Sequence, residues 1–579
     1  MNQRMVFFVG FPLLWAVLWG LVAAVSVGLR PPLPGTELHT LAMAWDMWQR
    51  DAFLVPGLAG NQPDTVYPLY LWLIHGTWAL FGISDTWPRL LPPVLGLGCT
   101  VMIAALCRAI WPGWAGLGAL AGTMAMGMAG WLVFATISGA DLLFTLCILV
   151  ALWGLIIGWR RGTWDGFVLL GFGIGLGFLV NGLSILVHVL PVALLTPVWA
   201  PALGWATTGA AKQGTEYAGS SGWRQWYVRL GISLLIGIIM IAAWIVPAVM
   251  ASGSGEGMAA IALLVSGFMF GSTVFMTSGV GAGGQQWWLY LLALGFFLLP
   301  WIVWPAAWRA IGGLWPLLKD GGGRFCLIWL LPSVIVYALL PGARPFDVAL
   351  HVPPLAMIAA YLLYLRVDAE MARQEAERRF GNGEAVLGML IALIGMALIV
   401  VPLSGGLMVL PWWIEGISGA WGLVLVGVAA IAAYGAPRMV IFRATLVTIQ
   451  MALVVLIGML AASPLLMAQA NIGPAADHLR HALDQDTAVA FVGTSPSYGH
   501  AMDFPARLEQ PLAILDPEDS IGVVAWAAGH EGGQIAVVMD QLLMGGKPVA
   551  IFPYMGQYLV FWATEIIAEH PGIVVGPMP

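Results

Sequence analysis

The chain has 579 residues, of which 60% are hydrophobic and only 9% are charged. Soluble domains carry about 25% charged residues, so this composition excludes a soluble enzyme, a disordered chain and a disulfide-rich secreted scaffold. The formal net charge of −6 excludes the basic surface that a nucleic-acid-binding protein needs. Repeated apolar stretches that can cross a hydrocarbon layer of about 30 Å predict a polytopic membrane protein.

Hydropathy along the chain predicts an all-α membrane core of about thirteen spanning helices. The first apolar run is too long for the core of a typical signal peptide and more spans follow it, so it is predicted to be an uncleaved span. In chain order the predicted spans lie near residues 5–28, 89–111, 114–135, 139–159, 165–180, 182–200, 225–250, 286–308, 325–341, 347–365, 385–403, 412–434 and 440–465.

Small residues inside these spans are predicted to serve packing. Alternating glycines over residues 171–177 lie within one span, not between a strand and a helix, which favours close helix contact over a phosphate-binding loop. The cysteines lack CxxC spacing and are predicted to be small buried hydrophobic residues. They are Cys99, Cys107, Cys147 and Cys326.

Positive charges set the predicted orientation of the spans. With the N-terminus in the cytoplasm, 16 of the 23 basic residues lie in cytoplasmic segments, and the outer side of the membrane part holds only four. These four are Arg30, Arg50, Arg89 and Arg344. An odd number of spans then places the C-terminal tail outside.

Three segments lie outside the predicted spans: a first outer loop over 29–88, a second over 251–285, and the tail. Residues 556–570 of the tail have helical character. The sequence thus predicts a transmembrane core over 1–469 and a small extracytoplasmic α/β domain over 470–579. Four short apolar runs in the tail are typical of strands. They are Thr487–Gly493, Pro511–Leu515, Ile535–Asp540 and Pro548–Phe552.

The first outer loop holds the densest set of polar residues at the predicted membrane surface. Thr36 is placed to cap a helix over 37–50, because its hydroxyl can accept from the free N–H groups of the first turn. A second helix is predicted over 68–82, and both are rich in tryptophan, which suits helices lying in the membrane interface. Polar candidates on these two helices are Glu37, His39, Asp46 and Tyr70.

The order of motifs along the chain resembles a family of membrane enzymes. After the first span come an acidic residue, the stretch DAFLVPGLAG (51–60), the stretch YPLYLWLIHGTWALFGISD (67–85) and an Arg-Leu pair at 89–90. Further on are Asp141 in SGADLLFTL and the stretch QQWWLYLLALGFFLLPW (285–301). This order is similar to that of the ArnT-like glycosyltransferases, relatives of the protein mannosyltransferases with the GT-C architecture.

The resemblance implies a transferase of the plasma membrane, the inner membrane in bacteria, that uses a polyprenyl-phosphate-linked sugar donor. The acceptor would be an outer-leaflet lipid, a glycan such as lipopolysaccharide or another envelope glycan, or a protein. The only other expected partners are membrane lipids, with no nucleic acid. No cofactor is required, because the lipid phosphate is the leaving group, and no metal ligands are assigned, although a divalent cation is left open.

In the family, acidic residues of the first loop lie at the transfer centre. The resemblance therefore gives Glu37 the role of general base or charge stabiliser, with Asp141 as a second carboxylate. A leaving phosphate needs cationic partners in a site of low dielectric constant, and Arg89 and Arg344 lie at span ends, where they could reach a head group. The full set of candidates for substrate binding is Arg89, Arg344, His39, Asp46 and Tyr70.

The chain also departs from the family pattern. The segment 257–284 holds no charged residue or histidine before the PWW-like element. Thr36 stands where the family has Asp, Val66 and Asn181 stand where it has Lys, and Pro345-Phe346-Asp347 replaces its PHY pattern. These losses support a first alternative, a catalytically silent relative that binds a lipid or a partner protein. A second alternative is a flippase or transporter, which would predict paired ionisable residues deep in the spans and interrupted helices.

Other polar residues are predicted to have structural roles. The histidines on apolar helices, His75 and His188, are expected to be satisfied packing residues. The tail residues His500, Asp503 and Arg507 are expected to stabilise the fold. Glu415, which follows two tryptophans, is expected to anchor a span in the interface.

Overall fold

The computed structural model describes residues 10–58, 62–63, 68–114, 116–137, 139–203, 220–251, 287–339, 345–371, 383–400, 416–433, 440–493, 499–540 and 547–574. The chain divides into two compact units. The first, called the helical unit, comprises Met1–Ser26, Leu90–Val274 and Gly283–Ala461. The second, called the loop–tail unit, comprises Val27–Arg89, Phe275–Ala282 and Ala462–Pro579. Arg344 and Glu415 lie outside the described residues.

Long apolar helices confirm an integral membrane protein. Among the described residues, eight helices are long and apolar enough to cross a membrane, or nine if the bent pair α10 (Ser184–Leu194) and α11 (Thr196–Trp199) forms one span. Further helices of the core are shorter, so the count of about thirteen stays a prediction. The long helices are α2 (Phe11–Leu29), α5 (Thr86–Ile110), α8 (Gly139–Arg161), α9 (Trp164–Asn181), α12 (Ser220–Ala251), α17 (Gly321–Leu339), α18 (Val352–Met371) and α23 (Val440–Ala470).

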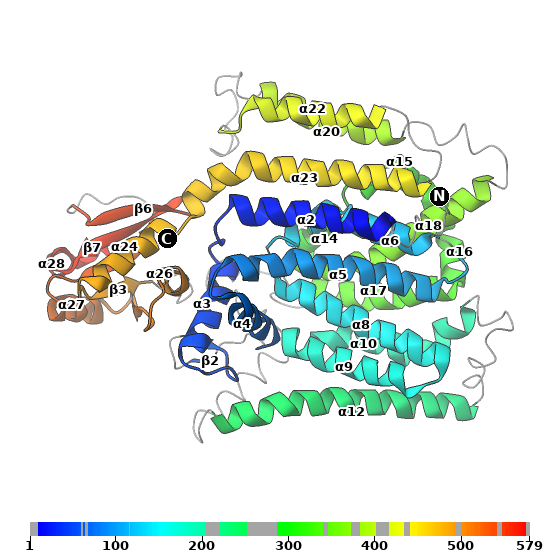
Figure 1. Cartoon of the computed structure of the whole chain (residues 1–579), viewed down its shortest axis with the longest axis horizontal. Coiled ribbons are helices and arrows are strands. Elements are labelled where there is room, and N and C mark those ends of the chain that lie inside the picture. Colours follow the sequence, from blue (N-terminus) through cyan, green and yellow to red (C-terminus); the bar gives the residue numbers. More distant parts are fainter. Residues whose placement is uncertain are drawn as a thin grey trace. The chain divides into compact units, whose positions relative to one another are not determined.

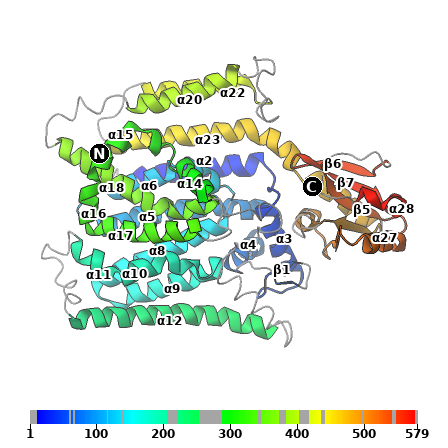
Figure 2. The same cartoon turned by 180° about the vertical axis from the view of Figure 1, so that it is seen from behind.

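Shorter elements of the helical unit lie within the remaining predicted spans or between spans. The helices α20 and α22 pack against each other as an antiparallel pair (Figures 1 and 2). These elements are α6 (Leu117–Met126), α7 (Ala129–Phe134), η2 (Ala200–Ala202), α14 (Trp287–Phe297), η6 (Trp301–Val303), α15 (Pro305–Ala310), η7 (Ile311–Gly313), α16 (Leu314–Lys319), η8 (Pro345–His351), α20 (Gly383–Val400) and α22 (Gly419–Ala433).

The predicted span 114–135 is not one continuous helix. The helix α6 ends at Met126, and α7 begins at Ala129, whose backbone N–H donates to the Leu299 carbonyl at 2.8 Å. Gly127 at the break lies so close to Thr448 that a Cβ there would be 2.5 Å from the threonine Oγ1. Tertiary contacts of distant segments therefore divide a stretch that hydropathy alone shows as uniform.

Glycines bring neighbouring helices of this unit into backbone contact, as predicted. A Cβ on Gly171 would lie 2.5 Å from the Ser233 carbonyl of α12, and a Cβ on Gly173 would lie 2.7 Å from the Ala151 backbone of α8. The helices α8, α9 and α12 accordingly lie side by side (Figure 1). Small residues serve this role in membranes because helices there associate through close van der Waals packing. All four cysteines are free and buried, also as predicted.

The loop–tail unit begins with the two predicted loop helices, α3 (Thr36–Gln49) and α4 (Pro68–Phe81), with the short strands β1 (Gly57–Leu58) and β2 (Gln62–Pro63) between them. The prediction that Thr36 caps the first helix is wrong. The residue at the N-cap is Gly35, with φ at 86°, and Thr36 is the first residue of the helix itself. Glycine adopts this positive φ without the strain that a Cβ would add.

A five-stranded sheet in the order β4-β3-β5-β7-β6 forms the core of the tail (Figure 2). The strand β3 pairs in parallel with β4 and β5, and β7 pairs antiparallel with β5 and β6. These strands are β3 (Val489–Val492), β4 (Ala513–Leu515), β5 (Gln534–Met539), β6 (Ala550–Tyr554) and β7 (Gln557–Ala563). The predicted α/β fold of the tail is thereby confirmed.

Helices surround this sheet, and one of them corrects the sequence prediction. The helical character assigned to 556–570 holds only for α28 (Thr564–Glu569), because the first half of that segment is β7. Residues 559–562 are all buried, as expected for a strand covered on both faces. The other helical elements are α24 (Gly473–Asp484), η10 (His500–Met502), α26 (Asp503–Ala506), α27 (Ser520–Gly529) and η11 (Pro571–Ile573).

Candidate functional site

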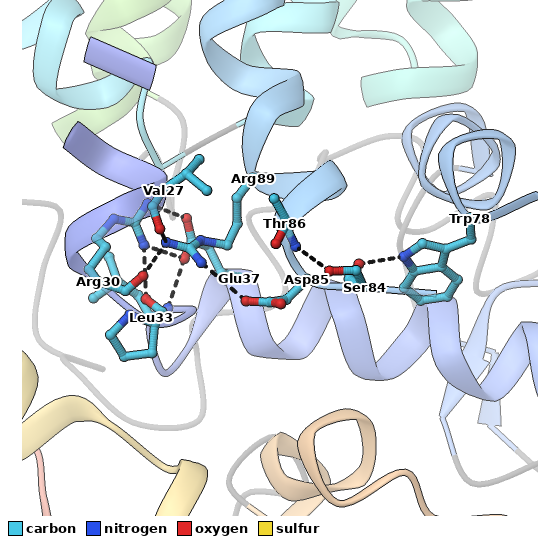
Figure 3. A network of polar contacts seen from close by, with 10 residues as sticks. Val27, Arg30, Leu33, Glu37, Trp78, Ser84, Asp85, Thr86 and Arg89 are labelled. Atoms are coloured by element: carbon cyan, nitrogen blue, oxygen red, sulfur yellow. Dashed lines mark hydrogen bonds and ion pairs between the residues drawn. The ribbon is translucent and has the colours of Figure 1, made fainter. Parts of the chain in front are cut away.

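A buried ion pair lies at the start of the first loop helix (Figure 3). Arg30 Nη1 and Nη2 donate to the two carboxylate oxygens of Glu37 at 2.6 and 2.7 Å, and the Leu33 backbone N–H donates to Glu37 Oε2 at 2.7 Å. The side chains of Arg30 and Glu37 are only 5% and 9% exposed. A bidentate arginine–carboxylate pair is among the stronger polar contacts in proteins, so both oxygens of Glu37 are occupied in this conformation.

Arg89 extends the same network from the start of α5 (Figure 3). Its Nη1 donates to Asp85 Oδ2 at 3.1 Å, and its Nη2 donates to the carbonyl of Val27 at 2.9 Å and to the carbonyl of Arg30. The Arg89 side chain is 6% exposed. It thus holds the backbone at the end of α2 and just after it, ahead of the turn that leads into α3.

The remaining loop candidates lie on α3 and α4. Asp46, which is 8% exposed, accepts from Arg50 Nε at 2.9 Å and also from Arg50 Nη2. His39 is half-buried on α3, and Tyr70 is buried on α4. Asp46 is therefore not the solvated carboxylate that an exposed loop helix would present.

His75 of α4 packs among aromatic rings as the sequence predicts, although within the described residues its buried Nδ1 has no hydrogen-bond partner. Its Nε2 lies 2.8 Å from the Ala44 carbonyl, which makes this nitrogen the donor, and its ring lies against Phe53 and Trp48. Burial lowers the pKa of His75, and the hydrogen bond to Ala44 opposes this effect. The imidazole therefore ties α4 to α3 in its neutral form.

The loop helices and the tail share one aromatic core inside the loop–tail unit. Trp45 donates its Nε1–H to the Leu508 carbonyl at 2.8 Å, and Phe504 stacks on Trp78 with ring centroids 5.3 Å apart. The Arg507 guanidinium lies 4.2 Å from the Phe504 ring centroid and 5.2 Å from that of Trp45. Trp45, which is 7% exposed, therefore packs in protein and is not the lipid-facing anchor expected of an interfacial tryptophan.

A second polar cluster, missed by the sequence reasoning, lies inside the helical unit. The phenol of Tyr290 and Nδ1 of His351 are 3.0 Å apart, and Trp329 donates to His188 Nδ1 at 3.2 Å. The His188 ring centroid lies 5.6 Å from those of both His351 and Tyr337. We call His188, Tyr290, Tyr337 and His351 the ring cluster. Ionisable residues inside membrane segments are rare and often functional. This signal was available for both histidines, but His188 was predicted to be a packing residue and His351 was not considered.

Asp141 belongs to the helical unit and lies in the first turn of α8, 9% exposed. The helix α8 packs against η8, the turn that carries Asp347 and His351. Asp141 therefore lies on a helix that contacts part of the ring cluster, whereas Glu37, His39, Asp46, Tyr70 and Arg89 all belong to the loop–tail unit. In the described part of the chain, no group of three or more His, Cys, Asp or Glu side chains could hold a metal ion.

Comparison with known proteins connects these features to one group of enzymes. Residues 61–208 match the family model described as dolichyl-phosphate-mannose-protein mannosyltransferase. An undecaprenyl phosphate-α-4-amino-4-deoxy-L-arabinose arabinosyl transferase of Pseudomonas fluorescens is 27% identical over 262 residues, which cover 43% of this chain and 39% of that protein. The corresponding transferase of Pseudomonas aeruginosa is 26% identical over 257 residues, or 43% of this chain and 38% of its own length.

The structural likeness extends much further along the chain. The crystal structure of ArnT from Cupriavidus metallidurans bound to undecaprenyl phosphate matches with a TM-score of 0.70 at 15% identity, covering 96% of this chain and 98% of that one. Its apo form matches with a TM-score of 0.66, also at 15% identity, over 98% and 99% of the two chains. The predicted resemblance to ArnT-like GT-C proteins is thereby confirmed, and the GT-C fold covers nearly the whole chain.

Proposed function

We propose that this protein is a membrane glycosyltransferase that moves a sugar from a polyprenyl-phosphate donor to an outer-leaflet lipid, glycan or protein. The observation that carries the proposal is the match over 96% of the chain to a protein crystallised with undecaprenyl phosphate. The partial sequence matches to transferases that are named for an undecaprenyl-phosphate-linked sugar support the same donor class.

Two carboxylates carry the proposed chemistry. Asp141 acts as the general base toward the acceptor hydroxyl, because it is a buried carboxylate at a helix start in the core. Glu37 acts as the charge stabiliser. Its two oxygens already accept from Arg30 and Leu33, so a proton taken from the acceptor would have to displace one of these donors.

The leaving phosphate needs positive charge or hydrogen-bond donors. We propose that Arg89 and Arg344 supply them, with His39, Asp46 and Tyr70 contributing to substrate binding. In this conformation, Arg89 donates to the Asp85 carboxylate and to two backbone carbonyls through Nη1 and Nη2. A bound divalent cation would be a further source of positive charge.

One observation favours a second candidate function, a catalytically silent relative. The three outer-side arginines among the described residues all donate to protein groups: Arg30 to Glu37, Arg50 to Asp46 and Arg89 to Asp85 and two carbonyls. A protein that no longer stabilises a leaving phosphate would retain these contacts as structure, and its site would bind a lipid or a partner without turnover.

Deletion of the gene, followed by mass spectrometry of envelope lipids and glycans, distinguishes these functions. We expect deletion to remove a sugar-sized mass that the wild-type gene restores. Asp141→Asn keeps the size of the side chain and removes its charge, and we expect it to restore nothing at equal protein level. The matched control is Asp165→Asn, at an exposed carboxylate of the same unit, which should restore the mass fully.

The other outcomes assign the function differently. Equal restoration by Asp141→Asn and wild type would remove Asp141 from the mechanism and leave the transferase standing. An envelope unchanged by deletion, together with binding of undecaprenyl phosphate to the purified protein, would establish the silent relative. Glu37→Gln, tested in the same way, examines the charge-stabilising role.

The orientation of the chain forms part of the proposal. We propose a cytoplasmic N-terminus, a membrane domain over 1–469 and an extracytoplasmic domain over 470–579. The distribution of basic residues supports this arrangement, and the end of α23 at Ala470, followed by α24 from Gly473, supports the boundary. Cysteine-accessibility labelling of Lys547→Cys in intact cells tests it, because only an outer tail would react with a membrane-impermeant reagent.

A further inference from the structure

The turn between β6 and β7 presents an apolar side chain where the backbone favours a small polar one. Tyr554 pairs with Gln557, so Met555 and Gly556 form the whole turn. Their φ angles are 53° and 85°, and two positive values are what a type I′ turn requires. Asn or Asp followed by Gly is preferred there, because these residues tolerate positive φ. Met555 gains nothing from this backbone, and its side chain is 58% exposed.

This turn is attached to the end of a helix long enough to span the membrane. The Met555 backbone N–H donates at 2.7 Å to the carbonyl of Gln469, in the last turn of α23, and both residues belong to the loop–tail unit. At 1.5 Å per residue, about 39 Å of helix separates Gln469 from Arg443, close to the bilayer thickness with head groups of about 40–45 Å. Because an arginine at a span end extends to the interface, Gln469 falls at the level of the opposite head groups.

Apolar surface continues from the turn along one face of β6, which is the outermost strand of the described sheet. Ile551 alternates with Pro553 along β6, and Tyr558 pairs with Pro553, so the three side chains lie on one face. Ile551 is 41% exposed and Tyr558 is 38% exposed. Tyrosine is enriched at membrane interfaces because its ring is apolar and its hydroxyl is polar, so this face suits contact with lipid.

The charge of the hairpin suits a lipid surface as well. The tail holds 12 acidic residues from position 475 onward, but none of them lies over 541–564. Asp540 follows Met539, which pairs with Tyr558, so Asp540 lies on the opposite face of the sheet from Tyr558. There it accepts from Gln557 Nε2 at 2.5 Å. The face of Tyr558 can therefore approach lipid phosphates without bringing this carboxylate against them.

We propose that the β6–β7 turn is a membrane anchor, in which Met555 and Tyr558 insert into the head-group region of the leaflet where α23 ends. The occupant of this surface is lipid. The anchor fixes the height of the tail sheet above the bilayer through a contact separate from the chain connection at Ala470. The inference goes beyond the proposed sugar transfer and does not depend on it.

Fluorescence quenching by spin-labelled lipids tests the anchor on the full chain in nanodiscs of phosphatidylethanolamine and phosphatidylglycerol. A nitrobenzoxadiazole fluorophore is attached to one introduced cysteine at a time, and the unsubstituted chain, whose cysteines are buried, gives the background. A nitroxide on the upper acyl chain quenches fluorophores at the membrane surface. We expect strong quenching at Met555→Cys and none at Ile521→Cys of α27. Because Ile521 is apolar and 82% exposed, this control excludes insertion driven by the fluorophore.

A series along the strand sharpens the test. Within the loop–tail unit, β6 runs away from the last turn of α23 (Figure 1), and a strand rises by about 3.3 Å per residue. Quenching should therefore fall several-fold from Met555→Cys to Ile551→Cys and fall again at Val549→Cys. Blue-shifted fluorescence at all three positions without quenching by lipid would assign this edge to a protein partner or a second copy of the chain, and the lipid anchor would be wrong.

Met555→Asn separates the anchor from the turn. Asparagine suits the positive φ, so the thermal transition should be no lower than that of wild type, while quenching at a Pro553→Cys reporter should fall several-fold. Equal quenching at this reporter with and without Met555→Asn would overturn the anchor, as would quenching at Met555→Cys no greater than at Ile521→Cys. The proposed transferase stands in either case, because the envelope glycans test it independently.

Discussion

The two units of this protein build their main polar clusters from different interactions. In the loop–tail unit, full charges are paired: Arg30 with Glu37, and Arg89 with Asp85 and two carbonyls. In the helical unit, the ring cluster joins imidazole and phenol groups, such as the Tyr290–His351 contact. A charge at membrane depth is costly without a partner, whereas rings can exchange hydrogen bonds without any net charge. The proposed placement of the two units, one in the membrane and one outside it, would account for this difference.

The apolar contacts of the two units differ as well. Helices of the helical unit approach through glycines whose Cβ positions are filled by neighbouring backbone, as at Gly166 against Gly158. The loop–tail unit instead packs large rings and a cation together, as in the Trp45, Phe504 and Arg507 group. Helices in lipid associate through close van der Waals contact, while large aromatic rings contribute stability through the area that they bury. We therefore expect different kinds of substitution to destabilise the two units.

The largest effect is expected from breaking the Arg30–Glu37 pair. Arg30→Met leaves Glu37 buried without its partner, which should lower the free energy of unfolding by about 3–5 kcal/mol. The double variant Arg30→Met/Glu37→Leu should recover most of this loss, because no buried charge remains. Thermal unfolding of the purified protein in detergent measures both.

The control for this experiment is an exposed ion pair. Arg161 and Asp165 have side chains 64% and 53% exposed, so Arg161→Met should change the free energy of unfolding by about 0.5 kcal/mol or less. A cost for Arg30→Met no larger than that of Arg161→Met would show that charge pairing does not hold the loop–tail unit.

The helical unit should be most sensitive at its glycine contacts. A Cβ on Gly166 would lie 2.2 Å from the Gly158 backbone nitrogen, and backbone cannot move aside as a flexible side chain can. Gly166→Val should cost about 3 kcal/mol or more, at the upper end for overpacking, and reduce the monodisperse fraction in size-exclusion chromatography. Gly231→Val is the control, because nothing lies within 4 Å of that Cβ; equal behaviour of the two variants would contradict the packing argument.

Most of this fold follows from local sequence pattern, and the exceptions have tertiary causes. Long apolar runs such as 139–159 predict their helices, because a span of that length and composition is stable in lipid without specific tertiary contacts. The break after Met126 does not follow from composition, because it depends on contacts with Thr448 and with Leu299. The strand β7 was likewise hidden, since an apolar run covered on both faces has no strand periodicity.

Only part of the candidate site could be predicted from the sequence, because tertiary packing alone brings some of its residues together. Glu37 and Arg89 were found because the loop concentrates polar residues in one short segment. The ring cluster was not assembled, because His188, Tyr290 and His351 lie on segments far apart in the sequence and only packing brings them together. The partner of Glu37 was also missed, since Arg30 was treated only as one of the outer charges.

A smaller effect is expected at Arg507, which joins the loop helices to the tail. Its guanidinium lies over the rings of Phe504 and Trp45, and a planar cation stacks on rings better than an ammonium does. Arg507→Lys should therefore lower the free energy of unfolding by about 1 kcal/mol, and Arg507→Ala by up to about 2 kcal/mol. If Arg507→Lys is as stable as wild type, then the positive charge of Arg507 stabilises this contact, and the stacking of its planar guanidinium does not.

The smallest expected effect is a change of stability with pH, caused by the titration of His75 in the loop–tail unit. Burial lowers the pKa of His75 in the folded protein. At a pH between that lowered value and about 6.5, His75 therefore binds a proton in the unfolded chain but not in the folded protein. Stability should consequently fall as the pH drops below about 6.5, with a slope of at most about 1.4 kcal/mol per pH unit for one proton. Thermal transitions at pH 5–8 for wild type and His75→Gln measure it, since glutamine keeps a donor for the Ala44 carbonyl and does not titrate. An identical acid slope in both proteins would place the titrating group elsewhere and remove His75 from the contrast between the units.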